Sequence, residues 1–566
     1  MTDSAVMSAA REGGATLAIR LLWPLLAGLL VIRLALAASC NLLPDEAFYW
    51  VWTRHLAGGY LDHPPMIAYL MWLSTRVLGN TQIGVRLPCV LMSLASIALI
   101  VALARRQLKD DRAAGYVAIM WLVSPLAAVT GLIFTPDTPS IFFSICALAC
   151  AVGICADDNA RPHAASDPDF SPSSGTPGEG WGGGYVEGAP FANSPHPNPP
   201  PEYRRRGQAS SPQSSARRRT PILWLLFGLF CGLALLSKYP SVVVPAGVTL
   251  ALLSSPSGRR HFRQPWIYLS GFIALAAFSP VIYWNATHHW ASFLFQLHHG
   301  ASEGITEGVD GAFRRLLVRA GGFGEFVAGQ AFVWTPVLFV ISIYVLFGNW
   351  RNYFRLRDSQ RILLWCATLP LVLFGWAATR SHTELNWPAF AYFPLSILIG
   401  GYLSDKWSLN RVNCIKLGCI VAAVSSILVH QLALPGVPGF LMKLHLPMPH
   451  NVTDLHGWPE YGQQISQRAA GMPVICNRHQ DAGEAEFYMP GQPPVWCEGV
   501  GSRPTAYDYI DSGRPDYTKI DRLIWVGSHE DEFMEKFHYT HTQRAPGIEM
   551  PGPGKHRSRP VYVVSK

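Results

Sequence analysis

Long apolar segments separated by short polar loops dominate the pattern of the chain. A membrane-spanning helix needs roughly 20 apolar residues, and eleven segments approach that length. The pattern therefore predicts a polytopic α-helical membrane protein with about eleven spans, in a membrane domain of residues 1–433. The expected spans lie near residues 17–38, 84–104, 113–133, 138–155, 221–237, 240–254, 265–284, 331–348, 362–379, 387–403 and 412–433.

Two regions depart from this pattern. Residues 157–220 are rich in Gly, Pro, Ser and Arg and bury too little apolar area to offset the entropy of ordering, so we expect a disordered cytoplasmic insert. Residues 434–566 contain short apolar runs such as Leu523–Val526, which predict a small C-terminal α/β or α+β domain. Cys476 and Cys497 fall in this domain, where an oxidising compartment would permit a disulfide.

The distribution of charge sets the expected orientation. Only 14% of residues are charged, against about 25% in a soluble chain, and the formal net charge is +8. Lys and Arg cluster in alternate loops, as the positive-inside rule requires. This pattern predicts a cytoplasmic N-terminus and a periplasmic C-terminal domain. The basic residues form no run with interleaved aromatics, so we expect no nucleic-acid partner.

The loops on the opposite, outer face hold most of the acids, histidines and amides near the membrane. Polar side chains at membrane depth are costly and usually functional. Convergence of five such loops on one face therefore predicts a site there. The residues are Asp45, Glu46, Asp62 and His63 in the first loop, Asp137 in the second, Lys238 and Tyr239 in the third, Asn285 and Gln296 in the fourth, and His382, Glu384 and Asn386 in the fifth.

The first outer loop resembles a known group of enzymes. Its sequences Pro44-Asp45-Glu46-Ala47-Phe48-Tyr49-Trp50 and Asp62-His63-Pro64-Pro65 are similar to bacterial membrane glycosyltransferases related to the dolichyl-phosphate-mannose protein mannosyltransferases. The lipid A aminoarabinose transferases and the rhizobial lipopolysaccharide galacturonosyltransferases belong to the same broad group. The resemblance covers roughly residues 20–400. It implies a GT-C fold, a bacterial inner-membrane location and a polyprenyl-phosphate sugar donor.

The resemblance also implies roles for single residues. In such enzymes an acid of the first outer loop is the catalytic base, and by motif this acid is Asp45, with Glu46 beside it. His63 stands where the aminoarabinose relatives have a Lys near the donor phosphate, so Lys238 is an alternative source of positive charge.

Some relatives also bind a metal near this loop. A divalent metal is therefore the one cofactor that the resemblance suggests, although it leaves the ligands open. Asp62, His298 and His382 are the candidate ligands.

Elementary chemistry assigns compatible roles. Sugar transfer from a lipid phosphate needs a base for the acceptor hydroxyl, positive charge at the leaving phosphate and alignment of both substrates. Asp45 and Glu46 suit the first requirement, and Lys238 and His63 suit the second. Asp137 would orient a hydroxyl or act as a second acid. Helix capping is the alternative for the three acids, and snorkelling is the alternative for Lys238.

The sequence thus predicts an inner-membrane glycosyltransferase that acts on the periplasmic face and is in contact with membrane lipids. The donor would be a polyprenyl-phosphate sugar, and the acceptor would be lipid A, another envelope glycolipid or a protein. The family mechanism implies inversion at the anomeric carbon. Protein O-mannosylation is the alternative within this class, and a transporter of lipids or envelope precursors is the alternative from another class. No GxxxxGK[ST] sequence occurs, so no ATP site is expected.

Overall fold

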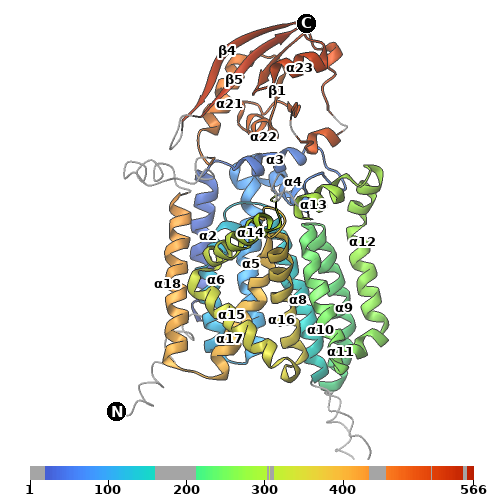
Figure 1. Ribbon diagram of the computed structural model, residues 1–566, viewed down its shortest axis with the longest axis vertical. Coiled ribbons are helices and arrows are strands. Elements are labelled where there is room, and N and C mark those ends of the chain that lie inside the picture. The colour runs from blue at the N-terminus through green and yellow to red at the C-terminus, as the bar shows by residue number, and fades with distance from the viewer. Residues whose placement is uncertain are drawn as a thin grey trace, which may run out of the picture.

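The fold is a bundle of helices beneath a small domain built on a sheet (Figure 1). The computed structural model describes residues 20–159, 212–301, 305, 311–432, 454–501, 503–510, 513–551 and 557–566. Each of the eleven predicted spans falls on a helix or on consecutive helices. The predicted class, a polytopic helical membrane protein with a small C-terminal domain, is confirmed.

The helices of the bundle follow the predicted apolar segments. Proline at the first helical position, where its missing N–H costs nothing, begins several of them. In chain order they are α2 Leu22–Ser39, α5 Gln82–Leu108, α6 Asp111–Leu122, α7 Pro125–Thr130, α8 Asp137–Asn159, α9 Pro212–Leu235, η2 Tyr239–Val242, α10 Val243–Leu253, α11 Pro256–Arg259, η3 Arg260–Arg263, α12 Pro265–Thr287, α14 Ala312–Trp334, α15 Pro336–Arg351, η5 Tyr353–Arg355, α16 Asp358–Ala377, η6 Trp387–Ala391, α17 Tyr392–Asp405 and α18 Leu409–Leu432.

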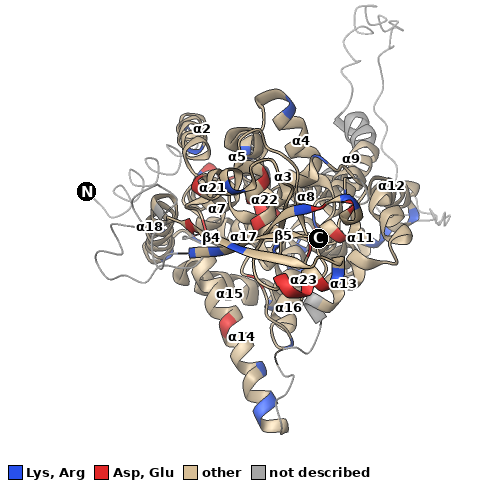
Figure 2. Ribbon diagram, turned by 90° about the horizontal axis from the view of Figure 1, so that it is seen from above, with Lys and Arg blue, Asp and Glu red and all other residues tan. Residues whose placement is uncertain are grey.

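Only part of the bundle has helices of full membrane length. Within the described residues, six helices are long and apolar enough to cross a membrane, or up to eight if each of two bent pairs is one span. In one of these pairs, α14 and α15 meet at 107°, where Thr335 adopts a φ of 70°. Figure 2 shows α14 projecting sideways from the bundle. The count of about eleven spans therefore stays a prediction.

Loops that the charge pattern assigned to one side do meet at one end of the bundle. Basic residues that follow α15 and begin α18 line a common cavity with the end of α5, among them Arg355, Arg357 and Arg411. This end lies away from the sheet domain (Figure 1). These three arginines are thus at the same end of the bundle, while the alternation of the remaining loops and the cytoplasmic location stay predictions.

The predicted insert is shorter at both ends than the composition indicated. α8 continues to Asn159 and α9 begins at Pro212, so residues 157–159 and 212–220 are helical, contrary to the predicted disorder. Extending an existing helix adds one hydrogen bond per residue and avoids the cost of nucleation. Residues 160–211 lie outside the described part of the chain, as do residues 433–453 before the sheet domain.

The C-terminal domain is a mixed five-stranded sheet with helices. Its strand order is β2-β1-β3-β5-β4, in which β1 pairs with β2 and β3 in parallel and the β3–β5 and β5–β4 pairs are antiparallel. The elements are α21 Trp458–Ala469, β1 Val474–Cys476, α22 His479–Tyr488, β2 Val495–Cys497, η7 Ala506–Tyr509, η8 Tyr517–Lys519, β3 Arg522–Val526, α23 Glu530–Phe537, β4 His541–Met550 and β5 Arg557–Ser565.

The two cysteines of this domain are neighbours without being bonded. Cys476 and Cys497 are register partners in the parallel β1–β2 pair, and both are buried free thiols. The Cys497 thiol donates instead to the Asn477 carbonyl at 3.6 Å. The disulfide that the sequence suggested is therefore not formed.

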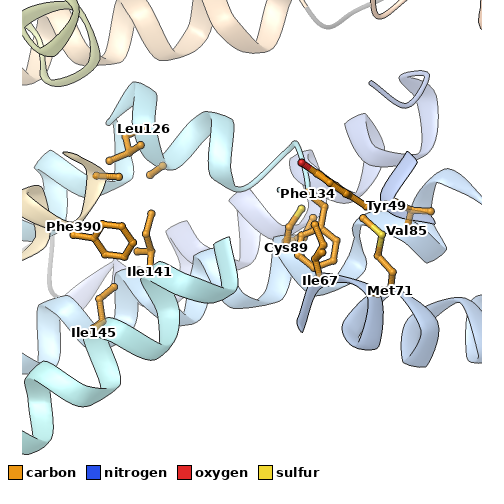
Figure 3. Close-up of a cluster of buried hydrophobic side chains, with 14 of the residues drawn as sticks. Tyr49, Ile67, Met71, Val85, Cys89, Leu126, Phe134, Ile141, Ile145 and Phe390 are labelled. Atoms are coloured by element: carbon orange, nitrogen blue, oxygen red, sulfur yellow. The ribbon is translucent and has the colours of Figure 1, made fainter. Parts of the chain in front are cut away.

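Short helices connect the bundle to the sheet domain at the end that the charge pattern predicts to be the outer one. These are α3 Pro44–Trp52, α4 Met66–Leu78 and α13 Ala291–Ala301. Buried side chains beneath α3, including Ile67, Val85 and Phe134, pack against Tyr49 of this helix (Figure 3). The apolar core thus extends to the outer end of the bundle and supports α3 from below.

The sheet domain rests on α3 through α22 (Figure 1). A Cβ added at Gly483 would lie 2.8 Å from the backbone nitrogen of Phe48, so the two helices touch backbone to backbone. Arg54, just after α3, also forms an ion pair with Glu486 of α22 at 2.8 Å. Close packing therefore fixes the sheet domain relative to the helix that carries Asp45.

Substitution Gly483→Val should weaken this docking. The new side chain would overlap the α3 backbone, and overpacking of this kind costs about 1–3 kcal/mol. Thermal unfolding of the detergent-solubilised protein measures the loss. Gly271→Val in α12 is the matched control, because no atom lies within 4 Å of a Cβ added there. Equal melting temperatures for the two variants would contradict the close contact.

Candidate active site

Helix α3 turns its two adjacent acids in different directions. Pro44 begins the helix, so Asp45 and Glu46 occupy the first turn, where the helix dipole favours negative charge. Successive residues of a helix point about 100° apart, because one turn takes 3.6 residues. As a result Glu46 is 0% exposed, whereas Asp45 is exposed.

Glu46 forms a buried ion pair with Arg86 of α5. Arg86, which is 1% exposed, donates to Oε1 from Nε at 2.9 Å and to Oε2 from Nη2 at 2.5 Å. The backbone N–H groups of Phe134 and Leu43 donate to the same carboxylate at 2.8 and 2.9 Å. Four hydrogen bonds occupy both oxygens, so the geometry favours a positioning role for Glu46 over the catalytic role predicted for it.

Asp45 lines a cavity of 510 Å³ between the bundle and the sheet domain. Although Asp45 is accessible from the cavity, the protein around it shields it from bulk water, and this desolvation, followed by the negative charges of Glu46 and Glu384, raises the pKa of Asp45 above its ordinary value. A carboxylate that is accessible from a cavity and has a raised pKa is suited to accept a proton. The cavity wall has an apolar part and a charged part in which arginines and acids are balanced: Val129, Ile133 and Val429, and Arg86, Arg478, Arg559, Asp45, Asp454 and Asp481.

Three predicted residues from separate outer loops meet at the start of α8. Lys238 donates to Asp137 Oδ1 at 2.8 Å, and Asn386 donates to Asp137 Oδ2 at 2.7 Å. Asp137 and Lys238 are both buried. Three of the five loops that the sequence predicted to converge therefore meet at Asp137, which orients Lys238 and Asn386.

Tyr49 lies close enough to Asp45, Asp62 and Asp137 to feel their charges. It follows Asp45 by four residues and so shares its face of α3. Burial and the charges of Asp45, Asp62 and Asp137 raise the pKa of Tyr49 well above its usual value. Its hydroxyl therefore stays a neutral hydrogen-bond donor. Tyr49 is not among the predicted site residues, and its spacing of four residues from Asp45 is the signal that could have identified it.

The Asp62-His63 segment lies beside Tyr49 and α13. Gln296 of α13 donates to the backbone carbonyl of Asp62 at 2.6 Å, and His63 packs edge-on against Tyr49 with ring centroids 5.9 Å apart. Arg503 of the sheet domain lies 3.5 Å from Asp62 Oδ1. Burial is the main cause that raises the pKa of Asp62 to about 6. Sequence reasoning missed Arg503, because no motif connects residue 503 with residue 62.

The remaining predicted residues lie around this region rather than at its centre. Asn285 is buried and accepts the Phe293 N–H at 3.1 Å, which fixes the turn into α13. The Tyr239 hydroxyl is 2.7 Å from Ser292 Oγ. His382 and Glu384 are exposed on the loop before η6. These residues shape or border the site, and nothing assigns them a chemical step.

The predicted metal has no evident set of ligands. Among the described residues, no group of three or more His, Cys, Asp or Glu side chains is arranged to hold a metal ion. His298 directs Nδ1 at the Leu294 carbonyl of its own helix, 2.8 Å away. The residues present do not fit a metal centre, so we derive no step through a metal.

The chain is similar to known proteins over much of its length. A family model described as dolichyl-phosphate-mannose-protein mannosyltransferase matches residues 62–163 and 214–284. The lipid A galacturonosyltransferase RgtD of Rhizobium johnstonii is 24% identical over 452 residues, which cover 78% of this chain and 76% of the relative.

Solved structures share the fold over nearly the whole chain. The crystal structure of ArnT from Cupriavidus metallidurans in the apo state superposes with a TM-score of 0.56 at 14% identity, covering 96% of this chain and 98% of ArnT. The structure of the same protein bound to undecaprenyl phosphate also gives 0.56, at 15% identity, and covers 95% and 97%.

The comparisons together support a membrane glycosyltransferase of the GT-C type. The chain is related to the dolichyl-phosphate-mannose-protein mannosyltransferases, to the lipid A galacturonosyltransferase RgtD and to ArnT. The resemblance noted in the first outer loop and the prediction of an enzyme are both confirmed.

Replacement of Glu46 tests its positioning role. Glu46→Gln would leave the buried Arg86 without its counter-charge, and breaking a buried pair in this way costs about 3–5 kcal/mol. We expect a clear drop in melting temperature in detergent together with lost activity. Glu325→Gln, an exposed acid of α14, should keep the wild-type melting temperature. A Glu46→Gln protein that is inactive but as stable as wild type would instead support a catalytic role.

Proposed function

We propose that the enzyme transfers a sugar from a polyprenyl-phosphate donor to a lipid A-type envelope glycolipid at the outer face of the bacterial inner membrane. The observation that carries the proposal is the meeting of Asp45, Asp62, Asp137, Lys238 and Arg503 at one end of an apolar helical bundle. Two relatives supply its chemistry, since one acts on lipid A and the other has been solved with undecaprenyl phosphate.

Asp45 is the proposed base. The acceptor hydroxyl would give its proton to Asp45 as its oxygen attacks the anomeric carbon, while the bond from that carbon to the phosphate oxygen breaks. A single displacement of this kind inverts the configuration. The phosphate leaves with its negative charge, which a nearby cation stabilises. Lys238 suits this role because its ammonium group has three N–H donors and the bond to Asp137 uses one of them.

The cavity beside Asp45 favours a lipid acceptor. Val129, Ile133 and Val429 give it an apolar wall, which suits the acyl chains of a glycolipid. Its charged lining is balanced, since Asp45, Asp454 and Asp481 accompany Arg86, Arg478 and Arg559, and Arg559 is paired with Asp481 at 2.8 Å. The apolar wall is why we favour lipid A-type acceptors over protein O-mannosylation. The polar groups also gather at one end of the bundle rather than at its middle, where a transporter would place its substrate site.

Substitution Asp45→Asn should abolish transfer while the fold is kept. An amide cannot accept the hydroxyl proton, and loss of a general base lowers rates by about 10²- to 10⁴-fold. The assay offers polyprenyl-phosphate sugars and extracted envelope lipids to purified protein and detects the glycosylated lipid by mass spectrometry. Asp521→Asn, an exposed acid of the sheet domain, is the control. Transfer by Asp45→Asn at the control rate would refute the assignment.

The pH dependence of the reaction gives a second test. Protein surroundings raise the pKa of Asp45, so protonation should remove the base at a pH above the ordinary carboxyl value of about 3.9. Activity should therefore rise with pH along an acidic limb centred above pH 4. Measurement of kcat/KM between pH 4 and 8 shows this limb. A limb that stays below pH 4 would contradict the role of Asp45.

A further inference from the structure

Arg503 is a cation that the sheet domain presents to the outer end of the bundle. It lies between β2 and η7, and its guanidinium is 4.9 Å from the ring centroid of Phe295 in α13. Its Nη1 is 3.5 Å from Asp62 Oδ1. The pKa values of Asp45 and Tyr49 are raised overall, and the positive charge of Arg503 opposes part of that rise. Its charge therefore acts where the proposed chemistry occurs.

The contact between Arg503 and Asp62 is loose. A well-formed charge-assisted hydrogen bond measures about 2.7–2.9 Å, and a guanidinium usually meets a carboxylate through two parallel bonds. Here the closest approach is 3.5 Å, and the Arg503 side chain is 54% exposed. A guanidinium has five N–H donors, and within the described residues Asp62 is the only carboxylate recorded as its ion-pair partner. Arg503 thus has donors available for another anion.

Asp62 is incompletely satisfied as well. Its Oδ2 is buried and has no hydrogen-bond partner among the described residues. A buried carboxylate oxygen without a donor is costly. The pair is therefore not a finished structural ion pair of the kind that Glu46 and Arg86 form.

Two other cations near this end, Arg86 and Lys238, are more firmly held. Arg86 is fully engaged by Glu46 and by the carbonyls of Cys40 and Asn41 at 2.9 and 2.7 Å. Lys238 is buried and donates to Asp137 at 2.8 Å. Of these three cations, Arg503 is the one that can move toward an incoming anion without giving up a short bond.

We propose that Arg503 is an anion-binding residue which the sheet domain contributes to the donor site. It would exchange its loose contact with Asp62 for an anionic group of the donor, either the lipid phosphate or a carboxylate on the sugar. The inference rests on the proposed function, because it takes the donor to be a polyprenyl-phosphate sugar. It makes the C-terminal domain part of the binding site.

Direct binding measurements on the full-length protein in detergent test this role. Isothermal titration calorimetry would compare wild type, Arg503→Ala, Arg503→Lys and Arg522→Ala. Arg522 is an exposed arginine at the start of β3 and serves as the matched control. The probes are undecaprenyl phosphate, a polyprenyl-phosphate uronic acid and a polyprenyl-phosphate neutral hexose. Melting temperatures and a transfer assay with wild type accompany the titrations.

Two results would support the proposal and identify the anion. If Arg503 binds the phosphate, Arg503→Ala should weaken binding of all three probes by about 10- to 100-fold, as expected for hydrogen bonds to a charged group. If it binds a sugar carboxylate, only the uronic acid donor should lose affinity, down to that of the neutral hexose donor. Arg503→Lys should recover part of the loss, since it keeps the charge without the planar fork.

Other results would overturn it. Unchanged affinity of Arg503→Ala for every probe, relative to Arg522→Ala, would refute the subsite while leaving the proposed function intact. Arg503-dependent binding without transfer by wild type would refute the proposed function alone. Absence of binding by wild type to all three probes would refute both.

Discussion

The buried ion pair between Glu46 and Arg86 is the constraint on which the site depends. Its carboxylate holds the Leu43 N–H at the start of α3 and the Phe134 N–H three residues before Asp137. The guanidinium holds the chain just before α3 through two carbonyls. One desolvated pair thus sets the distance between the first and second outer loops. Because its partners are charged and buried, losing either one leaves an expensive unpaired charge.

This constraint explains why two adjacent acids have different environments. Glu46 points inward, where its charge is neutralised and its oxygens are occupied. Asp45 points into the cavity beneath the sheet domain, where the same negative neighbour raises its pKa. Glu46 builds the site, and Asp45 is left accessible for the chemistry that we propose. The angle of about 100° between successive helical residues is sufficient to give the two acids different environments.

The sheet domain contributes to the site rather than merely covering it. Its helix α22 lies against α3 without side chains between them at Gly483. Its loop before η7 brings Arg503 to Asp62, and Arg478 just before α22 and Arg559 of β5 line the cavity beside Asp45. The membrane bundle supplies the apolar wall of that cavity and the polar cluster at Asp137. Two kinds of architecture therefore meet at α3.

The sequence by itself determined the helical membrane class, the small terminal domain and the outer loops that hold the polar residues. Period, length and charge are local properties, so they can be read along the chain. Only the tertiary structure decided that Glu46 is buried with Arg86, that Tyr49 stands among three acids, and that Arg503 reaches Asp62. Each of these depends on contacts between distant segments, and burial and pairing, which set the charge state of a side chain, exist only once those segments are packed together.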